Sequence, residues 1–397
     1  MPADGTKAST TVSPPGSPVS HCPSPHPAGR PPGAIRWGPR SGSRLPAPCG
    51  KRSPPKPALR AEAGNPDRGP QTAAPRPANS PRAPSTVPAQ VEVLVLLALK
   101  DGEAFLQAQL DSIAMQRGIR WELLVSDDGS TDAGPDILRA FASRFPPGQV
   151  RMIPGPGRGA AENFLHLLRA TDPSVPFVAF SDQDDVWMPD KLVRARERLA
   201  ECPAHLPALG FGHRLRCDSR LARPRPCSTP RRATGFRNAM VQNIAAGNTL
   251  LLNRAAIDLV LRHEAARAPV PLHDWWIYLL VTGAGGRAIP DPQPQLLYRQ
   301  HRGNMLGACN GARGRLRHMM QSLSGRSRRW NDANLAALSS LRGALTPENR
   351  AAFDRFTAAR RAPGLARRLR GLRASGVYRH SRAGQLALWL LAALNRL

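Results

Sequence analysis

Residues 175–187 read Val-Pro-Phe-Val-Ala-Phe-Ser-Asp-Gln-Asp-Asp-Val-Trp, an apolar run that leads directly into an acidic cluster. The run 175–180 has the length and composition of a buried strand, and Pro189 favours a helix start shortly afterwards. Carboxylates this close repel one another unless a cation lies between them, and a hard divalent ion such as Mg²⁺ would relieve that repulsion. The stretch predicts a strand that ends in a cation site, with a solvated acidic turn as the alternative.

Residues 1–88 differ in composition from the rest of the chain. They contain 22 of the 42 prolines and a single aromatic residue, Trp37. Such a segment buries too little apolar surface to offset the entropy of ordering it, so we predict a disordered Pro/Arg-rich extension. It has neither the apolar core of a signal peptide nor an amphipathic targeting helix. Alternatively, translation starts at Val87 or Val91, and the segment is not made.

The net charge of +28 is distributed unevenly along the chain. Residues 1–88 hold 12 basic and 3 acidic residues, residues 89–310 hold 26 and 22, and residues 311–397 hold 18 and 3. A nucleic-acid-binding domain concentrates basic charge on its folded part, so we expect no nucleic-acid partner. The basic ends instead predict appendages that face an anionic surface.

Cysteine usage bears on the compartment. The chain has six cysteines, and no two of them have CxxC spacing. This pattern argues against a structural zinc site and is compatible with a reducing, cytoplasmic environment.

Strands and helices alternate after residue 90. Apolar runs predict strands at 91–97, 121–125, 150–153 and 175–180, and helical spacing of apolar residues lies between them. This alternation predicts an α/β fold with a mostly parallel sheet and helices on both faces. Ligands of such sheets bind at the carboxyl ends of the strands.

A second acidic loop follows the predicted strand 121–125. It reads Ser-Asp-Asp-Gly-Ser-Thr-Asp from residue 126 to residue 132. Asp127 and Asp128 offer carboxylates to the hydroxyls of a ribose or to a base, and Gly129 permits a tight turn. Asp-Gly turns are common, but two acidic loops at strand ends of one sheet are a much stronger signal.

Four motifs together resemble family 2 glycosyltransferases of the GT-A fold, and more narrowly their bacterial rhamnosyltransferase-like branch. The resemblance covers residues 90–310, within a predicted catalytic domain 89–310. The motifs are Val-Ser-Asp-Asp-Gly-Ser-Thr-Asp at 125–132, Phe-Ser-Asp-Gln-Asp-Asp-Val-Trp at 180–187, His-Asp-Trp-Trp at 273–276 and Tyr-Arg-Gln-His-Arg-Gly-Asn at 298–304.

The resemblance implies a role for each motif residue. Asp274 is the implied catalytic base, because an acceptor hydroxyl needs a carboxylate to take its proton; an N-terminal helix cap is the alternative. Mg²⁺ or Mn²⁺ is the implied cofactor, with Asp182, Asp184 and His301 as ligands and Asp185 in support. The implied donor-binding residues are Asp127, Asp128, Asp182 and Arg158, and those for the diphosphate or acceptor are Arg299, Arg302, Asn248, Trp187 and Trp275.

One segment departs from the branch. The branch has Thr-Tyr-Asn after the first strand, whereas this chain has Leu99-Lys100-Asp101. Those positions help to hold the base and ribose in the branch, so the substitution leaves the choice of nucleotide open.

Residues 311–397 form a predicted basic helical tail. Its last apolar run, 386–394, is shorter than the roughly 20 residues that span a bilayer. A basic helix followed by a short apolar one is typical of an interfacial anchor on anionic lipid, and a solvated helix docked on the catalytic domain is the alternative. We therefore expect a peripheral protein on the inner face of the plasma membrane.

These observations predict an inverting, metal-dependent glycosyltransferase. It would move rhamnose or a similar sugar from a nucleotide-sugar donor to a surface polysaccharide or a polyprenol-linked acceptor. The alternative is a non-catalytic membrane or nucleic-acid-binding protein on a degenerate transferase scaffold. The acidic residues of the motifs argue against that alternative, whereas Leu99-Lys100 and the basic ends favour it.

Overall fold

The computed structural model describes residues 91–397 except 228–229, 231, 265–267, 302 and 304–325. The chain divides into two units, Met1–Ser80 and Pro81–Leu397, and every described residue belongs to the second. The predicted extension 1–88 and residues 311–325 of the predicted tail lie outside the described residues.

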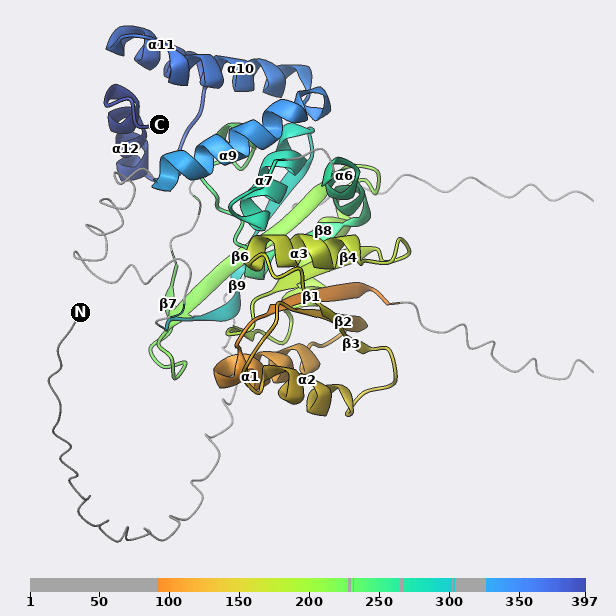
Figure 1. Ribbon diagram of the computed structural model, residues 1–397. Helices are drawn as coiled ribbons and strands as arrows, with labels where there is room; N and C mark the ends of the chain where they lie inside the picture. Colours follow the sequence, from red (N-terminus) through yellow and green to blue (C-terminus); the bar gives the residue numbers. More distant parts are fainter. Residues whose placement is uncertain (1–90, 228–229, 231, 265–267, 302, 304–325) are drawn as a thin grey trace, which may run out of the picture. The chain divides into compact units, whose positions relative to one another are not determined.

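The first half of the described chain has the predicted alternation of strands and helices (Figure 1). All four predicted strands and the three helices between them are confirmed. The elements are β1 (Val93–Leu99), α1 (Glu103–Ala114), β2 (Trp121–Asp127), α2 (Gly134–Ala142), β3 (Val150–Pro154), α3 (Ala160–Arg169) and β4 (Phe177–Ser181).

The second half adds strands to the same sheet and then continues as helices. The elements are β5 (Val186–Trp187), α4 (Lys191–Ala200), β6 (Ala208–Cys217), β7 (Arg225–Pro226), α5 (Phe236–Ala239), a 3₁₀ helix (Gly247–Thr249), β8 (Leu251–Asn253), α6 (Arg254–Glu264), α7 (His273–Gly283), β9 (Arg287–Arg299), α9 (Arg326–Ser340), a 3₁₀ helix (Arg342–Ala344), α10 (Pro347–Arg361), α11 (Leu365–Ser375) and α12 (Arg382–Ala393).

The strands form one sheet with the order β3-β2-β1-β4-β8-β6-β9-β5, and β7 pairs with β6. The first four strands are parallel, as predicted. Beyond β4 the sheet becomes mixed, because β8 is antiparallel to both β4 and β6 whereas β9 is parallel to β6.

Both faces of the sheet are covered, which explains why its central strands are apolar along their whole length. Along β1, Leu94 and Leu96 pack with α3 and α7 on one face, while Val95 and Leu97 pack with α1, α2 and α4 on the other. Figure 1 shows α1 and α2 on one side of the sheet and α3 on the other. The predicted α/β architecture is confirmed.

The parallel register brings the acidic loops to one edge of the sheet. Leu99 at the end of β1 pairs with Asp127 at the end of β2, and Leu97 pairs with Ser181 at the end of β4. The chain builds outward from β1 through β2 to β3 and then returns to place β4 on the other side of β1. Ligands of open α/β sheets bind at such a reversal of strand order, where the loops after β1 and β4 diverge.

The C-terminal helices are part of the core on the α7 face and are not appendages. Asn349 of α10 donates to the carbonyls of Thr282 and Gly283 at the end of α7, both at 3.0 Å. The C-terminal helices also bury apolar side chains in the cluster that contains Trp276 of α7. These side chains are Leu335, Leu338, Phe353, Phe356, Leu372 and Leu388.

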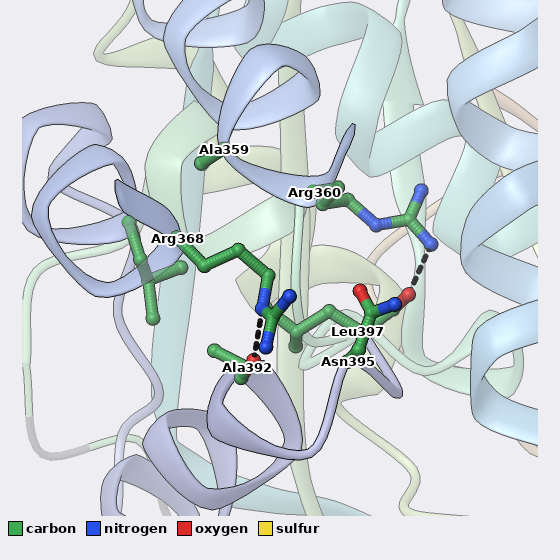
Figure 2. A pocket seen from close by; sticks show the side chains of 7 residues that line it. Ala359, Arg360, Arg368, Ala392, Asn395 and Leu397 are labelled. Carbon is green, nitrogen blue, oxygen red and sulfur yellow. Dashed lines mark hydrogen bonds between the residues drawn. The ribbon is translucent and has the colours of Figure 1, made fainter. Parts of the chain in front are cut away.

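Arginines tie α12 to its neighbouring helices. Figure 2 shows Arg368 reaching the end of α12, where its Nε donates to Ala392 O at 2.9 Å. The Arg360 guanidinium donates to Leu397 O. Arginine side chains at a helix C-terminus satisfy carbonyls that lack helical partners. The cavity between them is about 10 Å³, at most the space of one water, so this is a packing contact.

No helix among the described residues has both the length and the apolar character needed to cross a membrane.

Candidate active site

The loops after β1, β2 and β4 are hydrogen-bonded to one another. Gln183 accepts from Lys100 N and donates to Lys100 O, both at 2.8 Å. Asp101 N–H donates to Ser130 Oγ at 3.0 Å, and the Asp101 carboxylate accepts from Thr131 N at 2.8 Å. The segment that departs from the branch pattern thus connects the two acidic loops, and its Lys100 ammonium donates to Gly129 O.

Asp127 and Asp128 shape the β2 loop. Asp127 Oδ1 accepts from Ser130 N at 3.0 Å. Asp128 accepts from Gly157 N at 2.6 Å and from Gly159 N at 3.0 Å, so its carboxylate clamps a second loop across the sheet edge. Arg158 lies exposed between these two glycines. The roles of Asp127, Asp128 and Arg158 toward the donor nucleotide remain predictions.

Asp182, Asp184 and Asp185 form the acidic cluster. One oxygen from each lies within 4.8 Å of the others. Burial, followed by the charges of Asp184 and Asp274, raises the pKa of Asp182 to about 7. Burial and the charges of Asp182 and Asp184 also raise the pKa of Asp185 well above its usual range. Crowded carboxylates that resist ionisation fit a hard divalent cation, whose charge offsets their repulsion and whose preferred ligands are oxygens.

Asp185 is the innermost member of this cluster. Its side chain is fully buried, and it accepts from Asn248 Nδ2 at 2.6 Å and from Arg299 N at 3.3 Å. Asn248 is itself buried, and its amide holds Asp185. A contact of Asn248 with the diphosphate or acceptor remains a prediction.

His301 and Arg299 flank Asp184. His301 Nε2 lies 2.7 Å from Asp184 Oδ2. Its Nδ1 accepts from Gly303 N at 3.2 Å, so the ring proton is on Nε2 and points at the carboxylate. A role of His301 as a metal ligand, which would require Nε2 to lose that proton, remains a prediction.

Arg299 is a structural support for the acidic loop. Its Nε donates to Asp184 O at 2.8 Å, its Nη1 donates to Ser219 O at 2.6 Å, and its guanidinium lies over the Phe105 ring. The side chain is buried, and its contact with the diphosphate or acceptor remains a prediction. Arg302 lies outside the described residues.

Asp274 lies in the first turn of α7, one residue inside the helix. The cap position belongs to Leu272, so the alternative of an Asp274 cap is wrong. Asp274 Oδ2 accepts from Gly247 N at 2.9 Å, and its Oδ1 accepts from Trp275 N at 2.6 Å. The half-buried carboxylate thus has a fixed direction, and its charge acts on Asp182. One 3₁₀ turn, Gly247–Thr249, therefore holds both Asp274 and, through Asn248, the acidic cluster.

Trp187 and Trp275 are both buried. Trp187 is 2% exposed and packs in the core beneath the Lys191 ammonium, which lies 3.5 Å from the ring centroid. Trp275 is 8% exposed, and its Nε1 donates to Ala239 O at 2.6 Å. Both rings belong to the core, and their roles toward the diphosphate or acceptor remain predictions.

Two cations near the cluster were not predicted from sequence. Lys191 is buried, and burial lowers its pKa to about 7 even though the charges of Asp185 and Asp182 oppose that shift. Arg214 on β6 lies over the Tyr298 ring, and its charge also acts on Asp182. The burial of Lys191 could have been predicted from sequence, because it lies on the buried face of α4 with Ala195 and Leu199 at intervals of four. No such pattern indicates Arg214.

His273 is enclosed by rings beside Asp274. Its ring centroid lies 4.1 Å from that of Phe164 and 5.3 Å from that of Phe180. Its Nε2 has no partner among the described residues. Burial lowers the pKa of His273 from 6.5 to about 4, although the Asp274 charge opposes this. His273 is therefore neutral at pH 7.

Acid is expected to destabilise the fold through His273. Between pH 6.5 and 4 the unfolded chain binds a proton that the native protein does not, so the free energy of unfolding falls as pH falls. From pH 7 to pH 5 this contribution is about 2 kcal/mol, at about 1.4 kcal/mol per pKa unit. Denaturant unfolding at both pH values should show this loss in the wild type and its absence in His273→Gln. Equal losses in the two proteins would refute the prediction.

Comparison with known proteins shows similarity to one family over the strands that carry both acidic loops. Residues 95–251 match the model of glycosyl transferase family 2. The dTDP-rhamnosyl transferase RfbG of Shigella flexneri is 26% identical over 219 residues, which are 53% of this chain and 74% of RfbG.

Solved structures with partial similarity include two transferases. TarS 1-349 of S. aureus in complex with UDP-GlcNAc has a TM-score of 0.44 and 13% identity, over 77% of this chain and 88% of TarS 1-349. The mannosyltransferase PcManGT from Pyrobaculum calidifontis, in complex with GDP-Man and Mn²⁺, has a TM-score of 0.43 and 21% identity, over 76% of this chain and 86% of its own.

The family match spans β1 to β8, and therefore both acidic loops. Over this span the chain is similar to glycosyl transferase family 2, and over 219 residues it is similar to a dTDP-rhamnosyl transferase.

Proposed function

We propose that this glycosyltransferase is metal-dependent and inverting, and that it transfers rhamnose or a similar sugar from a nucleotide donor to an acceptor hydroxyl. The observation that carries the proposal is the composition of the site. Three carboxylates converge within 4.8 Å at the reversal of strand order, and the charge of Asp274, from a separate helix, reaches the same cluster.

The donor half of the site consists of the acidic cluster and the β2 loop. Asp182 and Asp184 would hold Mg²⁺ or Mn²⁺, and Asp185, fixed by Asn248, keeps the cluster in shape. When bound, the cation supplies Lewis-acid stabilisation of the charge that develops on the departing diphosphate. Arg158, exposed between the glycines that Asp128 clamps, would contact the nucleotide.

The acceptor half of the site centres on Asp274. Its carboxylate takes the proton of the acceptor hydroxyl as that oxygen bonds to the anomeric carbon of the sugar. The bond between that carbon and the diphosphate oxygen breaks, and the electron pair leaves with the nucleoside diphosphate. Attack opposite the leaving group inverts the anomeric configuration. The Gly247 N–H fixes one carboxylate oxygen, so the base needs no reorientation before it acts.

The similar proteins suggest a donor but not an acceptor. RfbG is a dTDP-rhamnosyl transferase, which supports dTDP-rhamnose as the donor. For the acceptor we propose a surface polysaccharide or a polyprenol-linked intermediate, handled at the inner face of the plasma membrane. The absence of any acidic residue after Asp354, where ten arginines follow, supports an anionic membrane surface as the partner.

A donor panel tests the proposal. Titration of the purified chain with dTDP-, UDP- and GDP-sugars in Mn²⁺ is expected to give the tightest binding for dTDP-rhamnose. A margin of about tenfold corresponds to one or two hydrogen bonds to the base. Slow hydrolysis of that donor should require Mg²⁺ or Mn²⁺. Failure to bind any of the three donor classes with either metal would contradict the proposal and favour a non-catalytic scaffold.

A further inference from the structure

A hollow of about 430 Å³ opens at the start of α12, on a different group of residues from the acidic site. Its lining contains two arginines and no carboxylate. The residues that line it are Arg232, His380, Ser381, Arg382 and Gln385. This composition is the reverse of that of the acidic site, and it favours an anionic ligand.

The N-terminus of α12 contributes to this hollow. Ser381 caps the helix, and its Oγ accepts from Gly384 N at 2.9 Å. The N–H groups of Arg382 and Ala383 have no acceptor among the described residues. The helix has 12 residues, and the positive end of its dipole adds to the arginine charges. Exposed N–H groups at such a helix end bind phosphate oxygens.

His380 is an independent indication of a ligand. The side chain is 8% exposed and lines the hollow. Its Nδ1 accepts from Arg232 N at 3.1 Å, so the ring proton is on Nε2. That Nε2 has no partner among the described residues. A buried N–H without an acceptor is unfavourable, and an anionic oxygen would satisfy it. Burial and the Arg232 charge lower the pKa of His380, so it donates as a neutral ring.

The surface next to the hollow bears on which molecule would carry the anion. Leu386, Leu390 and Leu394 are 71%, 52% and 52% exposed, and they follow Arg382 at intervals of four along α12. Residues four apart lie on one face of a helix. An exposed leucine stripe that begins at a phosphate-binding end matches an anionic lipid, whose headgroup is followed by acyl chains. The opposite face of α12 buries Leu388 and Leu391, so the stripe is not needed for packing.

We propose that the hollow at the start of α12 binds the phosphate of an anionic membrane lipid while the leucine stripe enters the acyl region. The inference deepens the proposed membrane location and rests on that part of the proposed function. Arg232 and Arg382 hold the phosphate from two sides, and His380 Nε2–H and the open helix N–H groups donate to its oxygens.

Vesicle co-sedimentation of the full chain tests the site. The wild type is expected to partition at least about tenfold more strongly onto phosphatidylcholine vesicles with 30% phosphatidylglycerol than onto pure phosphatidylcholine, at about 1 kcal/mol for each arginine near the surface. His380→Phe changes no charge, but it removes both the Nε2 donor and the Nδ1 acceptor of Arg232 N, so its partitioning should fall about fivefold or more, with melting temperature measured in parallel. Leu386→Gln should cause a comparable loss. Arg367→Gln on α11 keeps the hollow intact and is the matched control for charge.

Different results would contradict the site, the lipid assignment and the proposed function. If His380→Phe and Leu386→Gln keep wild-type partitioning and melting temperature while Arg367→Gln loses binding, the surface is diffusely basic and the site is refuted. If inorganic phosphate binds the wild type calorimetrically but phosphatidylglycerol vesicles do not, the ligand is a soluble phosphate and the lipid assignment fails. Because no sugar takes part, intact donor binding with no vesicle binding would overturn this inference alone. Vesicle binding without donor binding would overturn only the transferase chemistry.

Discussion

Asp274→Asn is expected to slow sugar transfer by about 10²–10⁴-fold, the usual effect of removing a positioned general base. Asparagine keeps one acceptor oxygen, for Gly247 N, and loses the bond that Asp274 Oδ1 accepts from Trp275 N, so melting temperature is measured in parallel with transfer. It cannot take the proton of the acceptor. Single-turnover transfer, measured with donor in excess of its dissociation constant, reports the loss directly.

The control for Asp274→Asn is Asp190→Asn, which removes one exposed carboxylate outside the site. Asp190, at the N-cap position of α4, pairs with Arg194 in that helix, so its loss should leave transfer within about twofold, as expected for a surface ion pair. Unimpaired transfer by Asp274→Asn would contradict the assignment and would place the base elsewhere.

Asp184→Asn is expected to reduce transfer by about 10³-fold or more. A metal at the departing diphosphate contributes several kcal/mol to the transition state, and each 1.4 kcal/mol is a tenfold change in rate. The fold should survive, because asparagine keeps an oxygen that accepts from His301 Nε2. Activity across a Mn²⁺ titration, with melting temperature measured in parallel, checks both expectations.

EDTA provides the companion measurement for Asp184→Asn. The wild type should lose activity in EDTA and recover it when Mg²⁺ or Mn²⁺ is restored. Near-normal turnover by the variant, or wild-type activity that persists in EDTA, would refute the metal site at Asp182 and Asp184.

The first four strands and the edge where their loops meet were predictable from sequence. Apolar runs such as 91–97 and 121–125 read as buried strands because both faces of the parallel sheet are covered. The parallel register then requires the loops after β1, β2 and β4 to share one edge. The approach of the two acidic loops followed from local pattern alone.

The rest of the sheet depends on contacts that no local pattern records. Strand β9 contains Pro290, Pro292 and Pro294, a composition that argues against a strand. It pairs with β6 across a register shift beside Gly212, where a Cβ would lie 2.2 Å from the Gln295 side chain. Only the tertiary fit of that glycine against Gln295 accommodates the strand.

The hydrogen bonds that position the aspartates of the site could not be predicted from sequence either. The Asn248 amide reaches Asp185 across 63 residues, and the Gly247 N–H reaches Asp274 across 27. The sequence indicated the aspartates of the site but not the residues that hold them. It predicted that Asn248 contacts the diphosphate or acceptor. The packing of the basic tail was hidden for a related reason, because its net charge gives no indication of the apolar side chains that share a cluster with those of α7.

Donor affinity in the two variants tests the central claim most directly, namely that the acidic cluster binds the donor and Asp274 serves the acceptor. Calorimetric titration of dTDP-rhamnose, with and without Mn²⁺, should give Asp274→Asn a wild-type dissociation constant that still depends on the metal. Asp184→Asn should lose that metal dependence. If Asp274→Asn loses donor affinity in proportion to its loss of rate, or if Asp184→Asn retains metal-dependent binding, the division of the site into these two halves is contradicted.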